Sequence, residues 1–90
     1  MFGSKEFQEI AKRTVFEMVQ EGLDPTDNIK LTMDDVYVTW FGFILGNMKA
    51  LVSTSLPDGK YYEVTYNNEK KEIYIDCYVK IKQKVVTVHM

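Results

Sequence analysis

The chain has 90 residues, which is enough for one small domain with a single hydrophobic core. Its hydrophobic fraction of 46% is typical of a globular protein and excludes a disordered chain. The formal net charge is −2, without a basic stripe, which argues against a protein that binds polymeric nucleic acid by neutralising phosphates.

The first predicted element is an amphipathic helix from about Ser4 to Gly22. Ser4 is a suitable N-cap, Glu6 suits the positive first turn, and Gly22 can end the helix in a left-handed conformation. Phe16 is expected on the exposed side, where a single apolar residue is a candidate contact residue. The opposite side is apolar and comprises Phe7, Ile10, Ala11, Thr14, Val15 and Met18.

A polar, proline-containing connection from Asp24 to Asn28 follows, and the apolar period then changes to two. The run from Val85 to Val88 is predicted either as a short fifth strand or as an extension of the fourth. The alternation predicts four strands, at Asp35–Leu45, Lys49–Leu56, Lys60–Asn67 and Glu72 to about Ile81.

Two turns between these strands have clear signatures. Gly46 and Asn47 suit a two-residue hairpin of type II′, in which the glycine supplies the positive φ. The segment 57–59, Pro-Asp-Gly, suits a type I turn that ends in a left-handed glycine with a bulge. Both turns predict antiparallel neighbours.

The third turn is predicted as a four-residue loop at 67–70. This loop places Val64 opposite Ile73, and by the same register it places Asp76 opposite Tyr61. A two-residue turn would instead set Val64 against a lysine, so the apolar match favours the longer loop.

These registers sort the strand side chains onto two faces of the sheet. The face expected to take the helix is apolar and comprises Phe41, Phe43, Leu45, Ala50, Val52, Tyr62, Val64, Tyr66, Ile73, Ile75 and Cys77. The other face mixes aromatic, aliphatic and polar residues, namely Val36, Val38, Trp40, Lys49, Leu51, Ser53, Ser55, Tyr61, Glu63, Thr65, Tyr74, Asp76 and Tyr78. The predicted fold class is therefore α+β, with one N-terminal amphipathic helix on a four- to five-stranded antiparallel meander in the order α-β-β-β-β.

The face without a helix is the candidate functional surface, because Trp and Tyr with few charges is the composition of binding hot spots. Three interpretations stay open: an ordinary solvated face of good strand formers, self-association, or the binding of a foreign ligand or protein. The candidate binding residues are Trp40, Tyr61, Tyr74, Tyr78, Val38 and Leu51, with Phe16 of the helix as a separate contact.

Residues that carry chemistry are few and dispersed. His89 and Cys77 have no partners at ligand spacing, so no metal is expected, and Cys77 on the predicted core face is expected to act as a small hydrophobe. Glu63 and Asp76 lie on an open sheet, where they are expected to pair with lysines rather than to catalyse acid–base chemistry. No glycine-rich loop leads into a helix, so no phosphate-binding loop and no cofactor are predicted.

The expected compartment is the cytoplasm. A single cysteine excludes an internal disulfide and is typical of a reducing environment. No apolar run reaches the length of a signal peptide or a membrane span, so no membrane is expected among the partners.

Four segments carry a resemblance that goes beyond this general pattern. They are VYVTWF (36–41), NMKALVST (47–54), PDGKYYEVTYN (57–67) and KEIYID (71–76), the last followed by Tyr78 and Lys80. Together with the opening helix and the polar connection, they resemble a family of small proteins of unknown function encoded by phages and prophages of Gram-positive bacteria. The resemblance covers nearly the whole chain. It implies a product that works inside a bacterial host, and it transfers no catalytic or ligand-binding residue.

We therefore expect a non-enzymatic phage or prophage accessory protein that binds a host protein and inhibits an antiviral defence or other host machinery. A homodimer is left open. The alternative from another class is a protein that sequesters a small ligand, such as a nucleotide signal, at a dimer seam. A minor enzyme is the third alternative.

Overall fold

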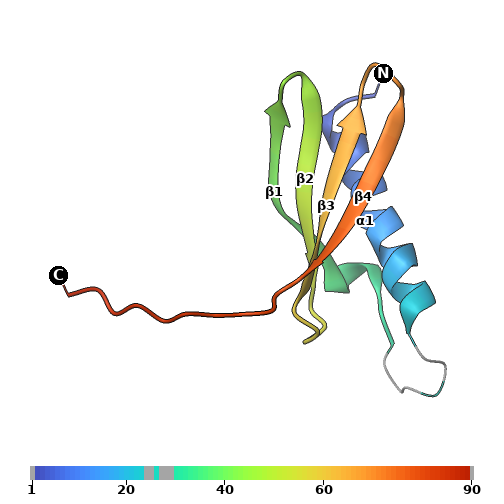
Figure 1. Ribbon diagram of the computed structural model, residues 1–90. Helices are drawn as coiled ribbons and strands as arrows, with labels where there is room; N and C mark the ends of the chain where they lie inside the picture. The colour runs from blue at the N-terminus through green and yellow to red at the C-terminus, as the bar shows by residue number, and fades with distance from the viewer. Residues whose placement is uncertain (1, 24–25, 27–29, 90) are drawn as a thin grey trace.

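The computed structural model describes residues 2–23, 26 and 30–89. It contains a helix on one side of a four-stranded antiparallel sheet whose strand order is β1-β2-β3-β4 (Figure 1). The predicted α-β-β-β-β architecture is confirmed, whereas the predicted connection at 24–28 lies outside the described residues except for Thr26. The elements in chain order are α1 (Ser4–Gly22), the short 3-10 helix η1 (Met33–Asp35), β1 (Val36–Ile44), β2 (Asn47–Thr54), β3 (Lys60–Asn67) and β4 (Glu72–Val79).

Helix α1 spans the predicted residues, but both predicted caps are wrong. Gly3 is the N-cap, and its amide donates a hydrogen bond of 3.0 Å to the carboxylate of Glu6, so Ser4 is already helical. Gly22 lacks a positive φ. The chain instead leaves the helix through an extended Leu23, whose amide donates to the carbonyl of Gln20 at 3.3 Å.

The buried side of α1 is rotated relative to the prediction. Its buried residues are spaced four apart, and the line continues to Val19, whereas Met18 is 36% exposed. Because of this rotation, Phe16 is half-buried and packs against the core, so its predicted exposed position is wrong. The core joins these helical residues to the sheet and consists of Phe7, Ala11, Val15, Val19, Leu31, Val36, Met48, Ala50, Val52, Tyr62 and Val64.

The hairpin between β1 and β2 turns one residue earlier than predicted. Ile44 pairs with Asn47, so the turn residues are Leu45 and Gly46, which have φ values of 53° and 82°. Two positive φ values define a type I′ turn rather than type II′. Leu45 consequently points into solvent and is 98% exposed, not on the helix-covered face. Asn47 is used elsewhere, because its side-chain oxygen accepts a hydrogen bond of 3.2 Å from the amide of Asn68.

A β-bulge at Thr39 divides β1 into two registers. Val38 pairs with Val52, but Trp40 pairs with Leu51, so Thr39 is the extra residue and its hydroxyl donates to the carbonyl of Leu51 at 3.2 Å. Because the bulge adds one residue, the side chains before it point to the opposite faces of the sheet from those predicted. Val38 and its neighbour Val36 therefore pack against the helix-side core, and their predicted place on the uncovered face is wrong.

The β3–β4 loop occupies 68–71 rather than 67–70. The side-chain oxygen of Asn67 accepts hydrogen bonds from the amides of Glu69 and Lys70, both at 3.0 Å, and Lys71 closes the loop with φ of 57°. The register is therefore two residues from the prediction, with Val64 opposite Ile75. A shift of two preserves the predicted faces of β4. The predicted opposition of Asp76 to Tyr61 is wrong, since Asp76 lies opposite Glu63.

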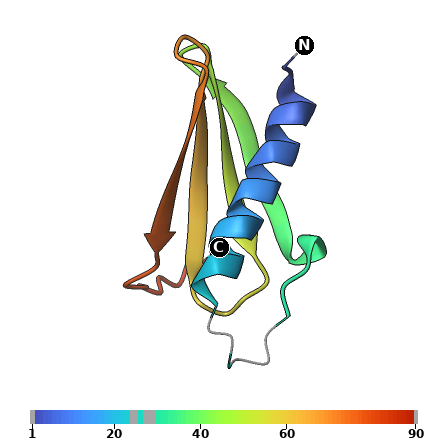
Figure 2. The same cartoon turned by 90° about the vertical axis from the view of Figure 1, so that its right-hand side faces the viewer.

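Strand β4 is an edge strand that the helix leaves uncovered. Helix α1 contacts β1, β2 and β3, and Figure 2 shows β4 lying to one side of it. Cys77 is therefore exposed, contrary to the predicted core position. Strand β4 ends at Val79, and the residues that follow, Lys80–His89, form an extended segment without strand pairing that we call the arm (Figure 1).

Candidate binding face

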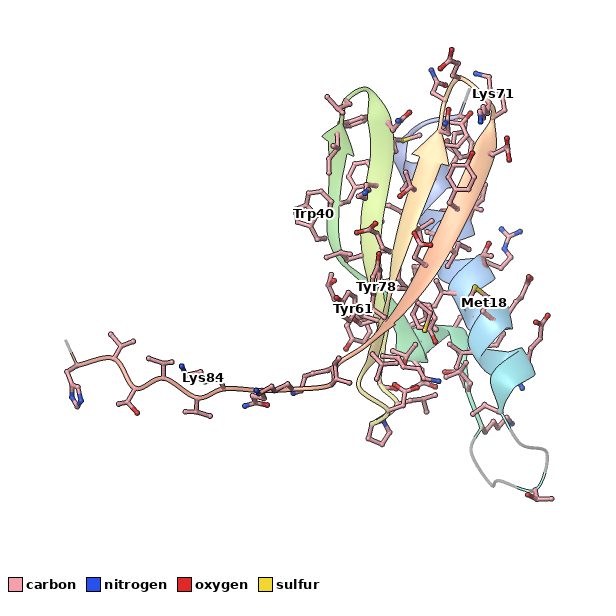
Figure 3. All side chains as sticks on the ribbon, in the orientation of Figure 1. Met18, Trp40, Tyr61, Lys71, Tyr78 and Lys84 are labelled. Carbon is pink, nitrogen blue, oxygen red and sulfur yellow. The ribbon has the colours of Figure 1, made fainter. Side chains whose placement is uncertain are left out.

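The sheet face opposite α1 is called the open face here. Figure 3 shows Trp40, Tyr61 and Tyr78 on the side of the sheet away from the helix. These three side chains and Tyr74 are between 39% and 44% exposed, so large aromatic surfaces reach solvent. The strand registers place the following residues on this face: Tyr37, Trp40, Gly42, Lys49, Leu51, Ser53, Tyr61, Glu63, Thr65, Tyr74, Asp76 and Tyr78.

Trp40 lies over Gly42, its neighbour two residues further along the same face of β1. A Cβ atom built on Gly42 would be 2.7 Å from Cζ2 of the indole ring, which is too close for a real contact. The missing side chain of the glycine therefore lets the ring lie against the backbone. This contact, together with half-buried Leu51 opposite Trp40, fixes one aromatic anchor at the β1 side of the face.

Tyr61 and Tyr78 form the anchor at the other side. They lie directly opposite each other on β3 and β4, and their rings stack with centroids 5.2 Å apart and planes 18° apart. The negative charge of Glu63, followed by burial and the charge of Asp76, raises the pKa of Tyr78 above its ordinary value. The hydroxyl is protonated at neutral pH, as a tyrosine with an ordinary pKa of about 10 already is, and can donate a hydrogen bond to a partner.

The centre of the face holds two carboxylates and one cation. Glu63 and Asp76 are directly opposite each other, and Lys49 Nζ lies 3.2 Å from Glu63 Oε1 in an ion pair whose side chains are 25% and 29% exposed. Like charges opposite each other destabilise a sheet. Lys49 compensates the charge of Glu63, and Asp76 forms no ion pair in the described part of the chain.

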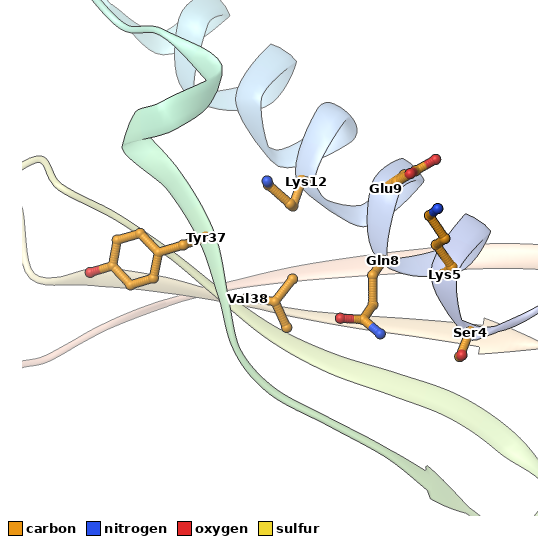
Figure 4. A pocket seen from close by; sticks show the side chains of 7 residues that line it. All are labelled: Ser4, Lys5, Gln8, Glu9, Lys12, Tyr37 and Val38. Carbon is orange, nitrogen blue, oxygen red and sulfur yellow. The ribbon is translucent and has the colours of Figure 1, made fainter.

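Two cavities of the described chain lie away from the centre of the open face. One of about 370 Å³ lies between α1 and β1, where Val38 points toward the helix and Tyr37 away from it (Figure 4). It is lined by Ser4, Lys5, Gln8, Glu9, Lys12, Tyr37 and Val38. The other, of about 250 Å³, lies beside the β1–β2 turn and is lined in part by Phe2, Phe43 and Tyr66. Neither contains Glu63 or Asp76.

Of the seven residues predicted to form the site, the structure brings five together on the open face: Trp40, Leu51, Tyr61, Tyr74 and Tyr78. Val38 and Phe16 lie on the helix side instead. Sequence reasoning missed Tyr37, because only the bulge at Thr39 brings it to this face. It also missed Gly42, although a glycine two residues from a tryptophan in a strand is a usable signal.

The fold and its uncovered aromatic surface define a small helix-on-meander domain with a candidate binding face. A family model described as a family of unknown function (DUF6275) matches residues 8–88, and the chain belongs to this family. The matched span includes the whole sheet and most of the arm. Comparisons with curated proteins and with solved structures find no match.

Membrane spans and metal sites can be assessed for the described residues. Among them, no helix has the length and apolar character needed to cross a membrane. Nor do three or more His, Cys, Asp or Glu side chains of this part of the chain come together as a metal site. The open face itself presents aromatic rings, hydroxyl groups, two carboxylates and the ammonium group of Lys49.

Proposed function

We propose that this protein is a non-enzymatic accessory protein of a phage or prophage, and that it binds a bacterial host protein through the open face. The bound accessory protein would block the functional surface of the host protein and so inhibit it. Inhibition of this kind is expected of a product directed against antiviral defence or other host machinery. The single observation that carries the proposal is the uncovered aromatic face, anchored by Trp40 on one side and the Tyr61–Tyr78 stack on the other. The phage origin rests on the resemblance of the four segments.

The size of the face supports a protein as the partner. Four strands about 4.8 Å apart and eight residues long at about 3.3 Å each give a surface of roughly 500 Å². That is slightly less than one side of a specific protein interface, about 600–1,000 Å², so residues around the edge of the face would complete the contact. Aromatic side chains on strands contribute large contact area and lose little rotamer entropy on binding, which suits Trp40, Tyr61 and Tyr78 as anchors.

The arrangement of polar groups favours binding over catalysis. Glu63 and Asp76 face open solvent beside Lys49, whereas catalytic carboxylates converge in a pocket that excludes water. Nucleotide sequestration is less favoured, because the same carboxylates repel phosphates and the tyrosine rings stack on each other.

The proposal is tested by affinity capture from a bacterial host lysate followed by binding measurements with the purified prey. Trp40→Ser and Tyr61→Ser remove the two anchors. Met18→Ser is the matched control, since Met18 is also exposed but lies on α1. Each anchor variant should raise the dissociation constant at least about 30-fold. This is the change expected when a hot-spot side chain contributes about 2 kcal/mol or more to the free energy of binding.

The control should bind like the original chain. Equal affinity of the original chain and the three variants would contradict the proposal. A host protein that binds both anchor variants but not Met18→Ser would also contradict it. The circular dichroism spectrum and the urea midpoint of each variant establish that a loss of binding does not reflect unfolding.

A further inference from the structure

The arm is an apolar and basic segment with exposed side chains. Ile81 is 95% exposed, and Val85, Val86 and Val88 are between 70% and 78% exposed. It runs away from the sheet in an extended conformation, as Figure 1 shows, and Figure 3 places Lys84 far from the domain. β-Branched residues in an extended segment favour strand pairing, and a solvated aliphatic run of this kind is a ready template for it.

Strand β4 has an unpaired edge to which an extended segment can add. It is the last strand of the sheet, so the backbone groups on its outer side have no strand partner in the described chain. Its helix-side residues are also poorly covered, because α1 does not lie over this strand. Ile73 and Ile75 are only half-buried, Cys77 is exposed, and Val79 is 52% exposed.

The arm does not fold back onto the β4 edge of its own chain (Figure 1). It follows β4 directly, and its first residue is still held beside β3, since the amide of Lys80 donates to the carbonyl of Gly59 at 3.0 Å. The tightest hairpin, a two-residue type I′ turn, needs two residues with positive φ, which Gly, Asn or Asp normally supply. The residues after Val79 are Lys80, Ile81 and Lys82, so the sequence provides no such turn.

We infer that the arm of one copy adds as a fifth, antiparallel strand to β4 of a second copy, and that the second copy returns its own arm in the same way. The exchange has two-fold symmetry about Lys80, and Ile81–Val88 matches β4 in length. On the helix side of the sheet, Ile81 then lies opposite Val79 and Val85 lies opposite Ile75, which joins apolar to apolar.

The same register satisfies the open side of β4. Lys84 lies opposite Asp76, the carboxylate that has no ion pair in the described part of the chain, and Val86 lies opposite Tyr74. Cross-strand pairs of opposite charge and of aromatic with β-branched residues are the favourable ones. The arm thus supplies the charge that Asp76 lacks.

Neighbouring registers are worse. A slip of two residues in one direction sets Val86 opposite Asp76, which leaves that carboxylate without a cation, and a slip in the other direction sets Gln83 opposite Ile75. A slip of one residue moves every side chain to the wrong face. The exchange concerns the β4 edge and goes beyond the proposed function, which concerns the open face.

A disulfide trap tests the register directly. In the exchanged pair, Gln83 lies opposite Cys77 of the second copy, and opposed residues have Cα atoms about 4.5–5.5 Å apart, within the range of a disulfide. Inside one extended chain the same two positions are about 20 Å apart. Gln83→Cys should therefore give a covalent dimer under mild oxidation on a non-reducing gel.

Two matched variants make the trap specific. Gln83→Cys combined with Cys77→Ser should give no covalent dimer, and Lys82→Cys, which points to the other face, should give much less. The inference is overturned if Gln83→Cys stays monomeric on the gel, or if Lys82→Cys is cross-linked equally well.

Light scattering of the full chain adds an independent test. The original chain should have the mass of a dimer, and a chain ending at Lys80 should have the mass of a monomer. Asp76→Lys and Lys84→Asp should each weaken the dimer about tenfold, and the combined variant should restore it. A full-length monomer would overturn the inference, as would a dimer that survives removal of the arm but is lost with Trp40→Ser, because that dimer would form through the open face.

Failure of this inference is distinguishable from failure of the proposed function. The chain ending at Lys80 retains all open-face residues, so it should still capture the host protein. The anchor variants Trp40→Ser and Tyr61→Ser should in turn still form the covalent dimer when they carry Gln83→Cys.

Discussion

Trp40 depends on Gly42 for its position on the open face, and the contact can be probed with one methyl group. In Gly42→Ala, the new Cβ would lie 2.7 Å from the indole ring, so the ring must swing away from the strand. The clash is with a movable ring, and alanine is a better strand residue than glycine, so we expect the free energy of unfolding to change by less than about 1 kcal/mol. The fluorescence of Trp40, the single tryptophan, should shift to longer wavelength.

Gly22→Ala is the control for this substitution. A Cβ on Gly22 meets no atom within 4 Å, so this change should leave the fluorescence unchanged and stabilise the end of α1 by about 0.5–1 kcal/mol. An unshifted emission spectrum in Gly42→Ala would mean that the indole ring does not rest on the glycine.

Asp35 makes the stability of the fold depend on pH in the acid range. Its carboxylate accepts hydrogen bonds from the amide of Thr32 at 2.8 Å and from the hydroxyl of Ser55 at 2.8 Å, and these bonds lower its pKa. A carboxyl whose pKa is lower in the folded state stabilises the fold above its unfolded pKa of about 3.9, and this contribution is lost as the pH falls through the folded pKa. Asp35→Asn should therefore lower the urea midpoint at pH 7.

The difference between Asp35→Asn and the original chain should shrink as the pH falls from about 4 through the lowered pKa of folded Asp35, because the protonated carboxyl is then neutral, like the amide that replaces it. Asp34→Asn, at the exposed neighbouring position, should leave the urea midpoint unchanged at both pH values. A difference for Asp35→Asn that is the same at pH 7 and pH 3 would assign its effect to shape rather than charge.

At the scale of elements, the β1–β2 hairpin carries a residue that its turn does not favour. Leu45 has φ of 53° in a type I′ turn, where Asn, Asp and Gly are preferred, and it is 98% exposed. Left-handed backbone costs a non-glycine residue roughly 1 kcal/mol, and Leu45 recovers nothing by burial. Leu45→Asn should therefore raise the free energy of unfolding by about 0.5–1 kcal/mol in urea denaturation.

Leu45→Ala separates conformation from hydrophobicity, since it removes the same exposed apolar surface without favouring the left-handed conformation. We expect it to be no more stable than the original chain. Equal stabilisation by alanine and asparagine would show that the strain at Leu45 is negligible.

The elements themselves could be predicted because periodicity and turn residues determine them locally. Gly59 has the predicted left-handed conformation, with φ of 70°, since only glycine adopts it without strain. Leu45 could not be predicted in that conformation, because nothing about a leucine indicates a positive φ. The bulge at Thr39 left no mark in the sequence either, and it reversed the face of Val38.

The candidate site was predicted better than the strand pairing that produced it. Both outer hairpins are two residues from the predicted register, yet a shift of two keeps each side chain on its face, so Trp40, Tyr61 and Tyr74 lie on the open face as expected. Phe16 was misplaced because the apolar side of α1 is broad and the sheet selects which part of it is buried. Helix rotation is a tertiary property.

At the scale of the whole molecule, one helix is too narrow for the sheet. It covers β1 to β3 on one face, and this leaves two surfaces without a partner, the open face and the β4 edge. The arm contributes Lys80, Lys82 and Lys84 without any carboxylate, so the rest of the chain is more acidic than the net charge of −2 indicates. Exchange of arms would place these cations beside the acidic open face of a second copy.

Exchange of arms also makes the stability of the fold depend on protein concentration. When folding and dimerisation are coupled, each tenfold increase in protein concentration stabilises the folded dimer by about 1.4 kcal per mole of dimer. The Tm of the full chain should therefore rise steadily between about 1 and 100 µM. The chain ending at Lys80 should unfold at a Tm that does not change with concentration. Val85→Asp, which places a charge opposite Ile75 in the exchanged sheet, should behave like the shortened chain although the arm is complete.

A Tm that is constant for the full chain would mean that the arm remains solvated. An equal rise in all three proteins would locate dimerisation on the open face instead, because that is the surface that all three retain.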